Sequence, residues 1–308
     1  MTTAFVFPGQ GSQSLGMLSS SASEVRGTFD EASEALGYDL WTLTQNGPED
    51  TLNQTEFTQP ALLTASVALW RLWAAEGGSA DFVAGHSLGE YSALVASGSI
   101  SLTDGVRVVQ RRGQLMQEAV PLGQGGMAAV MGLDDALIDS ACQRACDSIA
   151  DGTVQAANLN APGQVVISGT LEALQQASAF CEQAGAKRVV PLNVSAPFHS
   201  RLMKPAAEAL AEMLSSVTFS DPDIPIVQNV PAGAAESVEA MIDHLVTQLY
   251  SAVRWRESIE YLKQAGVDRV VECGPGKVLT GLNRRIDREI KVFNLDSSAL
   301  LPELKDFV

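Results

Sequence analysis

The sequence predicts an α/β protein in which a mostly parallel sheet, covered by helices on both faces, carries a small inserted α+β unit. Short apolar runs alternate with helical patterns in the first and last thirds of the chain, as in parallel sheets. The middle third has the order β-α-β-β-α-β, which is typical of a ferredoxin-like unit. We therefore expect residues 1–124 and 195–308 to form one discontinuous α/β domain, and residues 125–194 a ferredoxin-like small domain.

The elements of the first third follow from apolar runs, turn residues and helix caps. In chain order they are a strand at Ala4–Phe7 before a Gly-rich turn, a helix at Pro60–Ala75, a strand at Asp81–Gly85, a helix at Leu88–Ser97 and a helix to about Ala119. Pro60 suits the first turn of its helix, because proline lacks the N–H that an interior turn would use. Ser101 and Asp104 predict the start of the last of these helices as a capping box.

The remaining elements are predicted in the same way. The middle third holds strands at Met127–Met131, Val154–Asn158, Val165–Ser168 and Arg188–Leu192, a turn at Asn160–Gly163, and helices at Asp134–Ile149 and Thr170–Ala184. The last third holds helices at Met203–Ser215 and Ser237–Tyr250, strands at Ile226–Asn229 and Arg269–Glu272, a Gly-rich turn and helix, and a strand at Lys291–Leu295.

Composition limits the classes of protein that fit. The chain has 308 residues, 46% of them hydrophobic and 18% charged, which suits a globular fold with a real core. The net charge of −16 disfavours nucleic acid and anionic membranes as partners. An anionic partner could dock only on a local basic patch. There are two candidate patches, the pair Lys187 and Arg188 and the cluster Lys277, Arg284, Arg285 and Arg288.

No feature of the sequence predicts secretion, membrane insertion or a metal site. We expect no signal peptide and no membrane span, since no apolar run reaches the ~20 residues that a span needs. The four cysteines form no CxxC pair and histidine is scarce, which argues against zinc. Cys142 and Cys146 are one helical turn apart and fit the apolar face of a helix. We expect a cytoplasmic monomer.

The segment Gly85-His86-Ser87-Leu88-Gly89 matches the G-x-S-x-G nucleophile elbow of α/β-hydrolase-like domains. It follows a predicted strand and opens a predicted helix, as the motif requires. The sharp turn exposes the serine hydroxyl, and the N-terminus of the helix favours developing negative charge. A glycine-rich structural turn is the alternative. His86 is adjacent to the serine and is expected to point elsewhere, and Glu90 fits a structural role.

A serine nucleophile needs a base, and the chain has only three histidines. His244 lies within a predicted surface helix, which favours a solvent-exposed, non-catalytic side chain. His199 follows Ser195-Ala196-Pro197-Phe198 in a loop, where catalytic groups are common. The order serine then histidine agrees with nucleophile-elbow enzymes, although a loop histidine can also be merely solvated.

Four motifs occur in register along the chain. They are Phe7-Pro8-Gly9-Gln10-Gly11-Ser12-Gln13, Gly85-His86-Ser87-Leu88-Gly89-Glu90, Pro197-Phe198-His199-Ser200 and Glu272-Cys273-Gly274-Pro275-Gly276. With them the chain closely resembles the malonyl-CoA:acyl carrier protein transacylases of dissociated bacterial fatty-acid synthesis, over essentially its whole length. The resemblance implies transfer of a malonyl group from coenzyme A to an acyl carrier protein through an acyl-serine, with no cofactor or metal.

The resemblance also implies roles for individual residues. Ser87 would be acylated, with His199 as its base and the backbone carbonyl of Gln248 orienting the histidine. The backbone N–H groups of Gln10 and Leu88 would form the oxyanion hole. Arg112 would pair with the malonyl carboxylate, although Arg111 is a competitor by sequence alone. Two further residues complete the implied site, Asn160 near the active-site gorge and Phe198, which with Leu88 would favour malonyl over branched units.

Three alternatives remain open from the sequence. The first is a serine thioesterase or esterase on a similar elbow. The second is a trans-acting acyltransferase or acyl hydrolase of polyketide assembly. The third is a non-catalytic interaction protein on the same fold, which the presence of Ser87, His199 and Gln10 disfavours.

Overall fold

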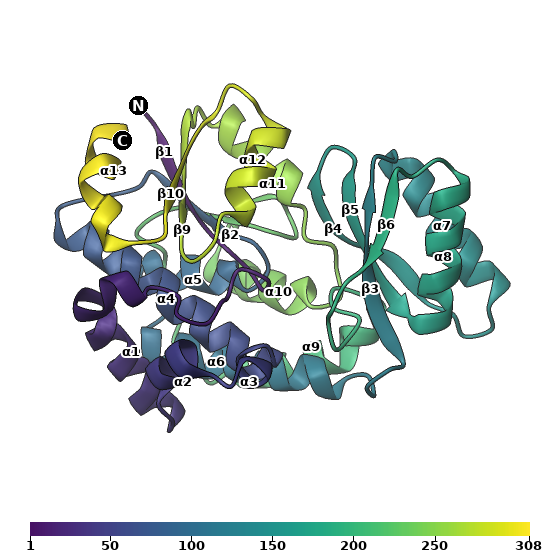
Figure 1. Cartoon of the computed structure of the whole chain (residues 1–308), viewed down its shortest axis with the longest axis horizontal. Coiled ribbons are helices and arrows are strands. Elements are labelled where there is room, and N and C mark those ends of the chain that lie inside the picture. Colours follow the sequence, from purple (N-terminus) through teal and green to yellow (C-terminus); the bar gives the residue numbers. More distant parts are fainter.

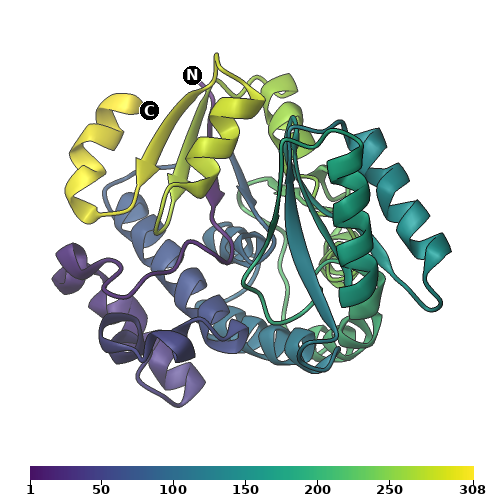
Figure 2. The ribbon, with the colours of Figure 1, turned by 45° about the vertical axis from the view of Figure 1, so that its right-hand side comes forward.

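The structure is a computed structural model that describes residues 1–308, and it is built on two sheets (Figures 1 and 2). The large sheet has the order β10 (Lys291–Leu295), β9 (Arg269–Cys273), β1 (Thr3–Phe7), β2 (Phe82–Gly85), β7 (Ile226–Gln228) and β8 (Gly233–Ala234). The small sheet has the order β4 (Val154–Ala161), β5 (Gln164–Thr170), β3 (Gly125–Met131) and β6 (Arg188–Pro191).

All neighbours in the large sheet are parallel except β7 and β8, and all neighbours in the small sheet are antiparallel. The small sheet carries its two helices on one side (Figures 1 and 2), and its strand order is that of a ferredoxin-like unit. The mostly parallel sheet and the small antiparallel sheet confirm the predicted fold class. The residue limits of the two predicted domains stay a prediction.

The helices surround the large sheet and cover one side of the small one (Figure 2). The first half of the chain has α1 (Ala22–Leu36), α2 (Leu40–Asn46), α3 (Glu49–Leu52), α4 (Thr55–Ala75), α5 (Gly89–Ala96), α6 (Leu102–Glu118) and α7 (Asp135–Ser148). The second half has α8 (Leu171–Gln183), α9 (Lys204–Leu214), α10 (Val238–Gln248), α11 (Trp255–Gln264), α12 (Val278–Ile286) and α13 (Leu301–Phe307). Short 3₁₀ turns are η1 (Ser19–Ser21), η2 (Arg201–Met203) and η3 (Ser298–Leu300).

Two details of the predicted elements are wrong, and five helices have no predicted counterpart. The unpredicted helices are α1, α2, α3, α11 and α13. Helix α4 begins at Thr55, so Pro60 lies inside it and not in its first turn. Burial of most of α4 offsets the one backbone hydrogen bond that proline removes. Asn160 and Ala161 belong to β4, and the predicted turn shrinks to Pro162 and Gly163.

Alternation along β1 divides the core into two layers. Phe5 and Phe7 face the larger cluster, where Phe5 meets Trp70 of α4 edge to face with ring centroids 5.1 Å apart. Ala4 and Val6 face the other side, which α11 and α12 cover. Helices α11 and α12 also contact β4, so they connect the large sheet to the small one (Figure 1).

The functional loops leave the large sheet at one edge. Strands β1, β2 and β7 are neighbours, and their carboxyl ends lead into the loops that begin at Pro8, His86 and Asn229. The fourth motif packs against the first, because a Cβ on Gly274 would lie 2.7 Å from the ring of Pro8. The Glu272 carboxylate accepts hydrogen bonds from the N–H groups of Leu279 and Thr280, so this motif residue caps α12.

Candidate active site

Ser87 stands on a strained turn between β2 and α5. Its φ of 50° lies in the left-handed region, which costs about 1–3 kcal/mol for a residue other than glycine. The flanking glycines make the turn possible. A Cβ on Gly85 would lie 1.9 Å from the backbone carbon of Gly89, and a Cβ on Gly89 would lie 2.0 Å from the carbonyl oxygen of Phe7. The geometry is that of a nucleophile elbow.

His199 faces the serine across the end of the sheet. Its Nε2 lies 2.8 Å from Ser87 Oγ, and its Nδ1 lies 2.8 Å from the backbone oxygen of Gln248. Because a carbonyl can only accept, Nδ1 carries the proton and Nε2 is left to accept from the serine hydroxyl. His199 also has a positive φ, 58°, and only 4% of it is exposed. The structure thus brings together Ser87, His199 and Gln248.

The imidazole is held neutral. Burial, and to a smaller extent the Arg112 charge, lower the pKa of His199 to about 3, while the hydrogen bond to the Gln248 carbonyl opposes this shift. A neutral ring at pH 7 is the state that a general base needs. No carboxylate contacts Nδ1, which agrees with a triad whose third member is a backbone carbonyl.

The two N–H groups expected to form the oxyanion hole are free. Neither the N–H of Gln10 nor that of Leu88 donates to any protein acceptor, while the N–H of Ser87 donates to Asn229 Oδ1 at 2.7 Å. Both residues line the same cavity as Ser87 and His199. Free N–H donors in such a cavity are suited to an oxyanion.

Arg112 is a buried cation without an anionic partner. Its guanidinium donates to Gln59 Oε1 at 2.7 Å, Gln248 Oε1 at 2.8 Å and Ser87 Oγ at 3.0 Å, and only 1% of the residue is exposed. Its Nε has no partner. Arg111 is exposed and lies 3.6 Å from Glu118, so only Arg112 reaches the site.

The cavity beside Ser87 is small and has mixed walls. Its volume is about 120 Å³, and its wall includes Met116 of α6, Met127 of β3, Asn158 of β4 and Phe198. The small sheet therefore supplies part of the wall. Phe198 is buried against this cavity. Two further pockets adjoin it, and one of them, of about 160 Å³, is lined by Asn160.

The other histidines do not face the nucleophile. His86 Nε2 lies 2.8 Å from Asn160 Oδ1, and its ring packs near Trp255, as expected for a side chain that points away from Ser87. His244 is not simply solvated, because its Nδ1 lies 2.8 Å from Gln228 Oε1. No group of three or more His, Cys, Asp or Glu side chains could hold a metal ion. No helix has the length and hydrophobicity to cross a membrane.

Three polar residues at the site were not predicted to have a role there. Gln59 holds Arg112, Asn229 holds the Ser87 N–H, and Glu90 accepts hydrogen bonds from Asn229 and Gln248. Asn229 follows the carboxyl end of β7, which is where parallel sheets place functional groups. Gln59 is a polar residue in a long buried helix, and this is the sequence signal that could have found it.

An elbow serine, a buried neutral histidine and two free N–H groups define the class of protein as an enzyme of acyl transfer through an acyl-serine. The family model for the acyl transferase domain matches residues 4–306. The malonyl CoA-acyl carrier protein transacylase of Salmonella typhimurium is 54% identical over 302 residues, 97% of each chain. That of Escherichia coli K12 is 55% identical over 301 residues, 96% of this chain and 95% of the relative.

Comparison with solved structures leads to the same group of proteins. An acyl carrier protein S-malonyltransferase from Vibrio cholerae matches with a TM-score of 0.96 at 49% identity, over 99% of this chain and all of that one. The malonyl transacylase solved in complex with a holo type II polyketide acyl-carrier protein matches with a TM-score of 0.97 at 49% identity, over 100% of both chains. The chain belongs to the acyl transferase domain family and, within it, to the malonyl CoA-acyl carrier protein transacylases.

Proposed function

We propose that the protein transfers a malonyl group from malonyl-CoA to the phosphopantetheine thiol of an acyl carrier protein, and so supplies malonyl units for fatty-acid synthesis. The observation that carries the proposal is Ser87 Oγ lying between His199 Nε2 at 2.8 Å and the Arg112 guanidinium at 3.0 Å. One contact supplies a base, and the other a cation where an acyl group with a free carboxylate would sit.

The first half-reaction forms the acyl-enzyme. His199 Nε2 takes the hydroxyl proton while Ser87 Oγ attacks the thioester carbonyl, and the N–H groups of Gln10 and Leu88 stabilise the oxyanion. The intermediate collapses with cleavage of the C–S bond, and His199 returns the proton to the coenzyme A thiolate. Arg112 pairs with the malonyl carboxylate throughout. The planar guanidinium offers two parallel donors that match a carboxylate.

The second half-reaction reverses the first. His199 takes the proton of the phosphopantetheine thiol, the sulfur attacks the acyl-serine, and Ser87 leaves with the proton from His199. The cycle is ping-pong and balances without a cofactor or a metal. We propose that Phe198 crowds a 2-methyl branch, and that Asn160 lies along the path of the pantetheine arm, since Phe198 lines the cavity beside Ser87 and Asn160 lines an adjoining one. We propose a cytoplasmic monomer.

The test mixes the enzyme with malonyl-CoA and a phosphopantetheinylated acyl carrier protein. We expect malonyl-carrier and free coenzyme A in equal amounts, and an acyl-enzyme that persists when the carrier is left out. Rapid discharge of the acyl-enzyme to water would instead support a thioesterase. No transfer to the carrier would contradict the proposal.

A second candidate is the supply of malonyl units to polyketide assembly. It is favoured by the likeness to the transacylase solved with a type II polyketide carrier. The chemistry at Ser87 is the same, and only the carrier differs. Comparing kcat/KM for a fatty-acid carrier and a polyketide carrier separates the two, and we expect the fatty-acid carrier to be preferred.

We propose that the carrier docks on one basic surface formed by Lys187, Arg188, Lys277, Arg284, Arg285 and Arg288. All six are exposed, and contacts connect the two halves of this surface. On one side, Arg285 donates to Gln164 Oε1 at 2.6 Å. The residue before Gln164 is Gly163, and its carbonyl oxygen accepts from the Gly132 N–H. The Lys187 side chain packs against Gly132 and completes the connection. The surface adjoins the pocket that Asn160 lines, because α12 also forms that pocket. Acidic carriers suit such a surface.

A further inference from the structure

Glu90 is a buried carboxylate that the reaction scheme above does not use. It is the second residue of α5, three positions after Ser87, and only 1% of it is exposed. No cation lies within ion-pair distance. Its Oε1 accepts from Gln228 Nε2 at 3.0 Å, and its Oε2 accepts from Asn229 N at 2.8 Å and from Gln248 Nε2 at 3.0 Å.

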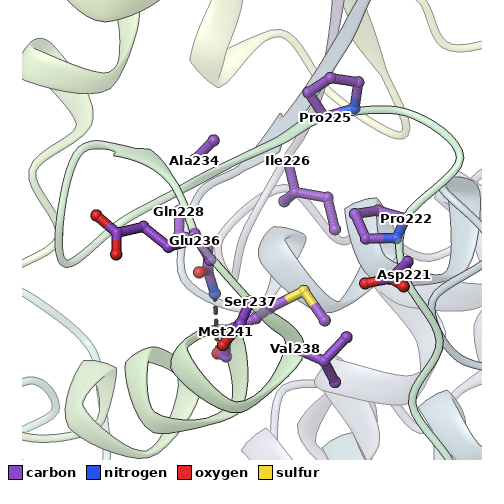
Figure 3. Close-up of a pocket in the computed structure, with 11 residues that line it drawn as sticks. Asp221, Pro222, Pro225, Ile226, Gln228, Ala234, Glu236, Ser237, Val238 and Met241 are labelled. Atoms are coloured by element: carbon purple, nitrogen blue, oxygen red, sulfur yellow. Dashed lines mark hydrogen bonds between the residues drawn. The ribbon is translucent and has the colours of Figure 1, made fainter.

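All three donors are fixed as donors by their other contacts. The Asn229 group is a backbone N–H. The Gln228 amide nitrogen also donates to the Met241 carbonyl at 3.1 Å, seen at the wall of a pocket in Figure 3, while its oxygen faces His244. The Gln248 amide oxygen accepts from Arg112, so its nitrogen must face Glu90. Both carboxyl oxygens must therefore accept, which only the ionised form does fully.

The same donors hold the reacting groups. The backbone oxygen of Gln248 accepts from His199 Nδ1, and the Gln248 amide nitrogen also donates to the Ser87 carbonyl oxygen at 3.2 Å. Asn229 Oδ1 accepts the Ser87 N–H. The Gln248 amide links Glu90 to Arg112, with its oxygen toward the cation and its nitrogen toward the anion. The Glu90 carboxylate thus fixes Gln248 and Asn229. These two residues in turn contact the nucleophile, its base and the Arg112 guanidinium.

We propose that Glu90 is a positioning residue for acyl transfer, whose ionised carboxylate holds Gln248 and Asn229 and, through them, His199, Ser87 and Arg112. This inference rests on the proposed function. It predicts that protonation of Glu90 slows acylation, because an O–H would then oppose one of the three fixed N–H donors.

Burial and the groups around Glu90 set its pKa near neutrality, where its protonation can be followed. Burial raises the pKa of Glu90 to about 7, against its three hydrogen bonds and the Arg112 charge on α6. Strands β1, β2 and β7 carry no ionisable side chain. On α4, Glu56 and Arg71 are not among the groups that shift the pKa of Glu90. His244 on α10 reaches it only through Gln228. Tyr91, with a pKa raised to about 12, and His199, with one lowered to about 3, do not titrate near neutrality.

The test is the rate of a single round of malonylation between about pH 6 and pH 9. We expect the wild-type rate to fall as the pH drops through about 7. Glu90→Gln keeps the shape of the side chain, but its amide N–H₂ group would face one of the three N–H donors that now bind the carboxylate. We expect its rate to be roughly tenfold to a hundredfold lower, as for a small misplacement of reacting groups, and to lack the acidic limb.

Two further variants keep the test decisive. Gln228→Met removes a donor that lowers the pKa of Glu90, so the acidic limb should move to higher pH. Ser92→Ala is the matched control on the same helix, because its buried hydroxyl has no partner, and it should behave as the wild type.

Three outcomes would overturn the inference. A Glu90→Gln enzyme with the wild-type rate and acidic limb contradicts it directly. If that variant does not fold, an unshifted limb in Gln228→Met contradicts it instead. No malonylation of the wild type overturns the proposed function and this inference together, whereas normal wild-type malonylation with insensitive variants overturns this inference alone.

Discussion

Arg112 is a buried cation that no carboxylate in the structure pairs with. Its charge is buried and surrounded by neutral amides, a hydroxyl and the Tyr91 ring, whose centroid lies 5.4 Å away. Burial lowers its pKa, and the Glu90 and Tyr91 groups oppose that shift. A substrate carboxylate would supply the missing partner, whereas an acetyl group would leave the cation unpaired.

Replacing Arg112 tests this argument at the scale of one residue. In Arg112→Met we expect kcat/KM for malonyl-CoA to fall by about a hundredfold to several thousandfold, the equivalent of roughly 3–5 kcal/mol for breaking a buried charge pair. The rate with acetyl-CoA should fall far less, so the preference for malonyl is lost. Steady-state kinetics with both thioesters measures this. Arg111→Met is the control, because Arg111 is exposed, and an equal fall with both thioesters in Arg112→Met would refute the role.

At this scale the sequence predicted the reacting atoms better than their supports. The G-x-S-x-G spacing and the scarcity of histidine led to Ser87 and His199, which lie 2.8 Å apart. Gln59, Asn229 and Glu90 were not predicted as parts of the site, because each acts through a contact between residues distant in the chain, such as the 2.8 Å bond from Asn229 N to Glu90 Oε2. Periodicity and local motifs contain no information about such pairs.

The element that decides the geometry of the site is the turn from β2 into α5. Helix α5 comes so close to β1 that no side chain fits at its first residue, Gly89. The Ser87 backbone stays in the left-handed region only because this packing fixes both sides of the turn.

Replacing Gly89 tests the elbow. In Gly89→Ala we expect the free energy of unfolding to fall by about 1–3 kcal/mol, and acylation to fall as well, since the added Cβ displaces the backbone that carries Ser87. Urea unfolding and malonylation rates measure the two effects. Gly27→Ala is the matched control, because Gly27 lies in α1 with no atom within 4 Å of an added Cβ. That variant should gain roughly 0.5–1 kcal/mol. Equal stability of the two variants would contradict the account.

Elements were predictable where local chemistry fixes their ends. Ser101 accepts from the Asp104 N–H at 3.0 Å, as the predicted cap requires. The start of α4 was wrong because burial overrides the preference of Pro60 for a first turn. Helix α11 was missed although its apolar residues, among them Trp255 and Leu262, face the large sheet.

At the scale of the whole molecule, the site lies where the two sheets meet. Residues 1–124 and 195–308 supply the nucleophile, base and cation, and the small sheet supplies a wall of the cavity. We propose that residues 1–124 and 195–308 together form one discontinuous domain, and that residues 125–194 form a second. Helices α11 and α12 contact both sheets. The basic surface therefore extends from α12, beside the large sheet, to the start of β6 in the small sheet.

Charge reversal on that surface tests carrier docking. In Arg284→Glu combined with Arg285→Glu we expect KM for the carrier to rise about tenfold or more, while acylation by malonyl-CoA is unchanged, because rim charges act mainly on encounter. The rise should shrink at high salt. Arg26→Glu on α1, also exposed, is the control. Carrier kinetics that do not change would exclude this surface.

The most direct test of the central claim is to find which atom carries the acyl group. Intact mass spectrometry and peptide mapping after mixing with malonyl-CoA should show one malonyl group on Ser87, and none in Ser87→Ala. His199→Gln should form the same adduct much more slowly. A malonyl group on another residue, or full transfer by Ser87→Ala, would contradict the account.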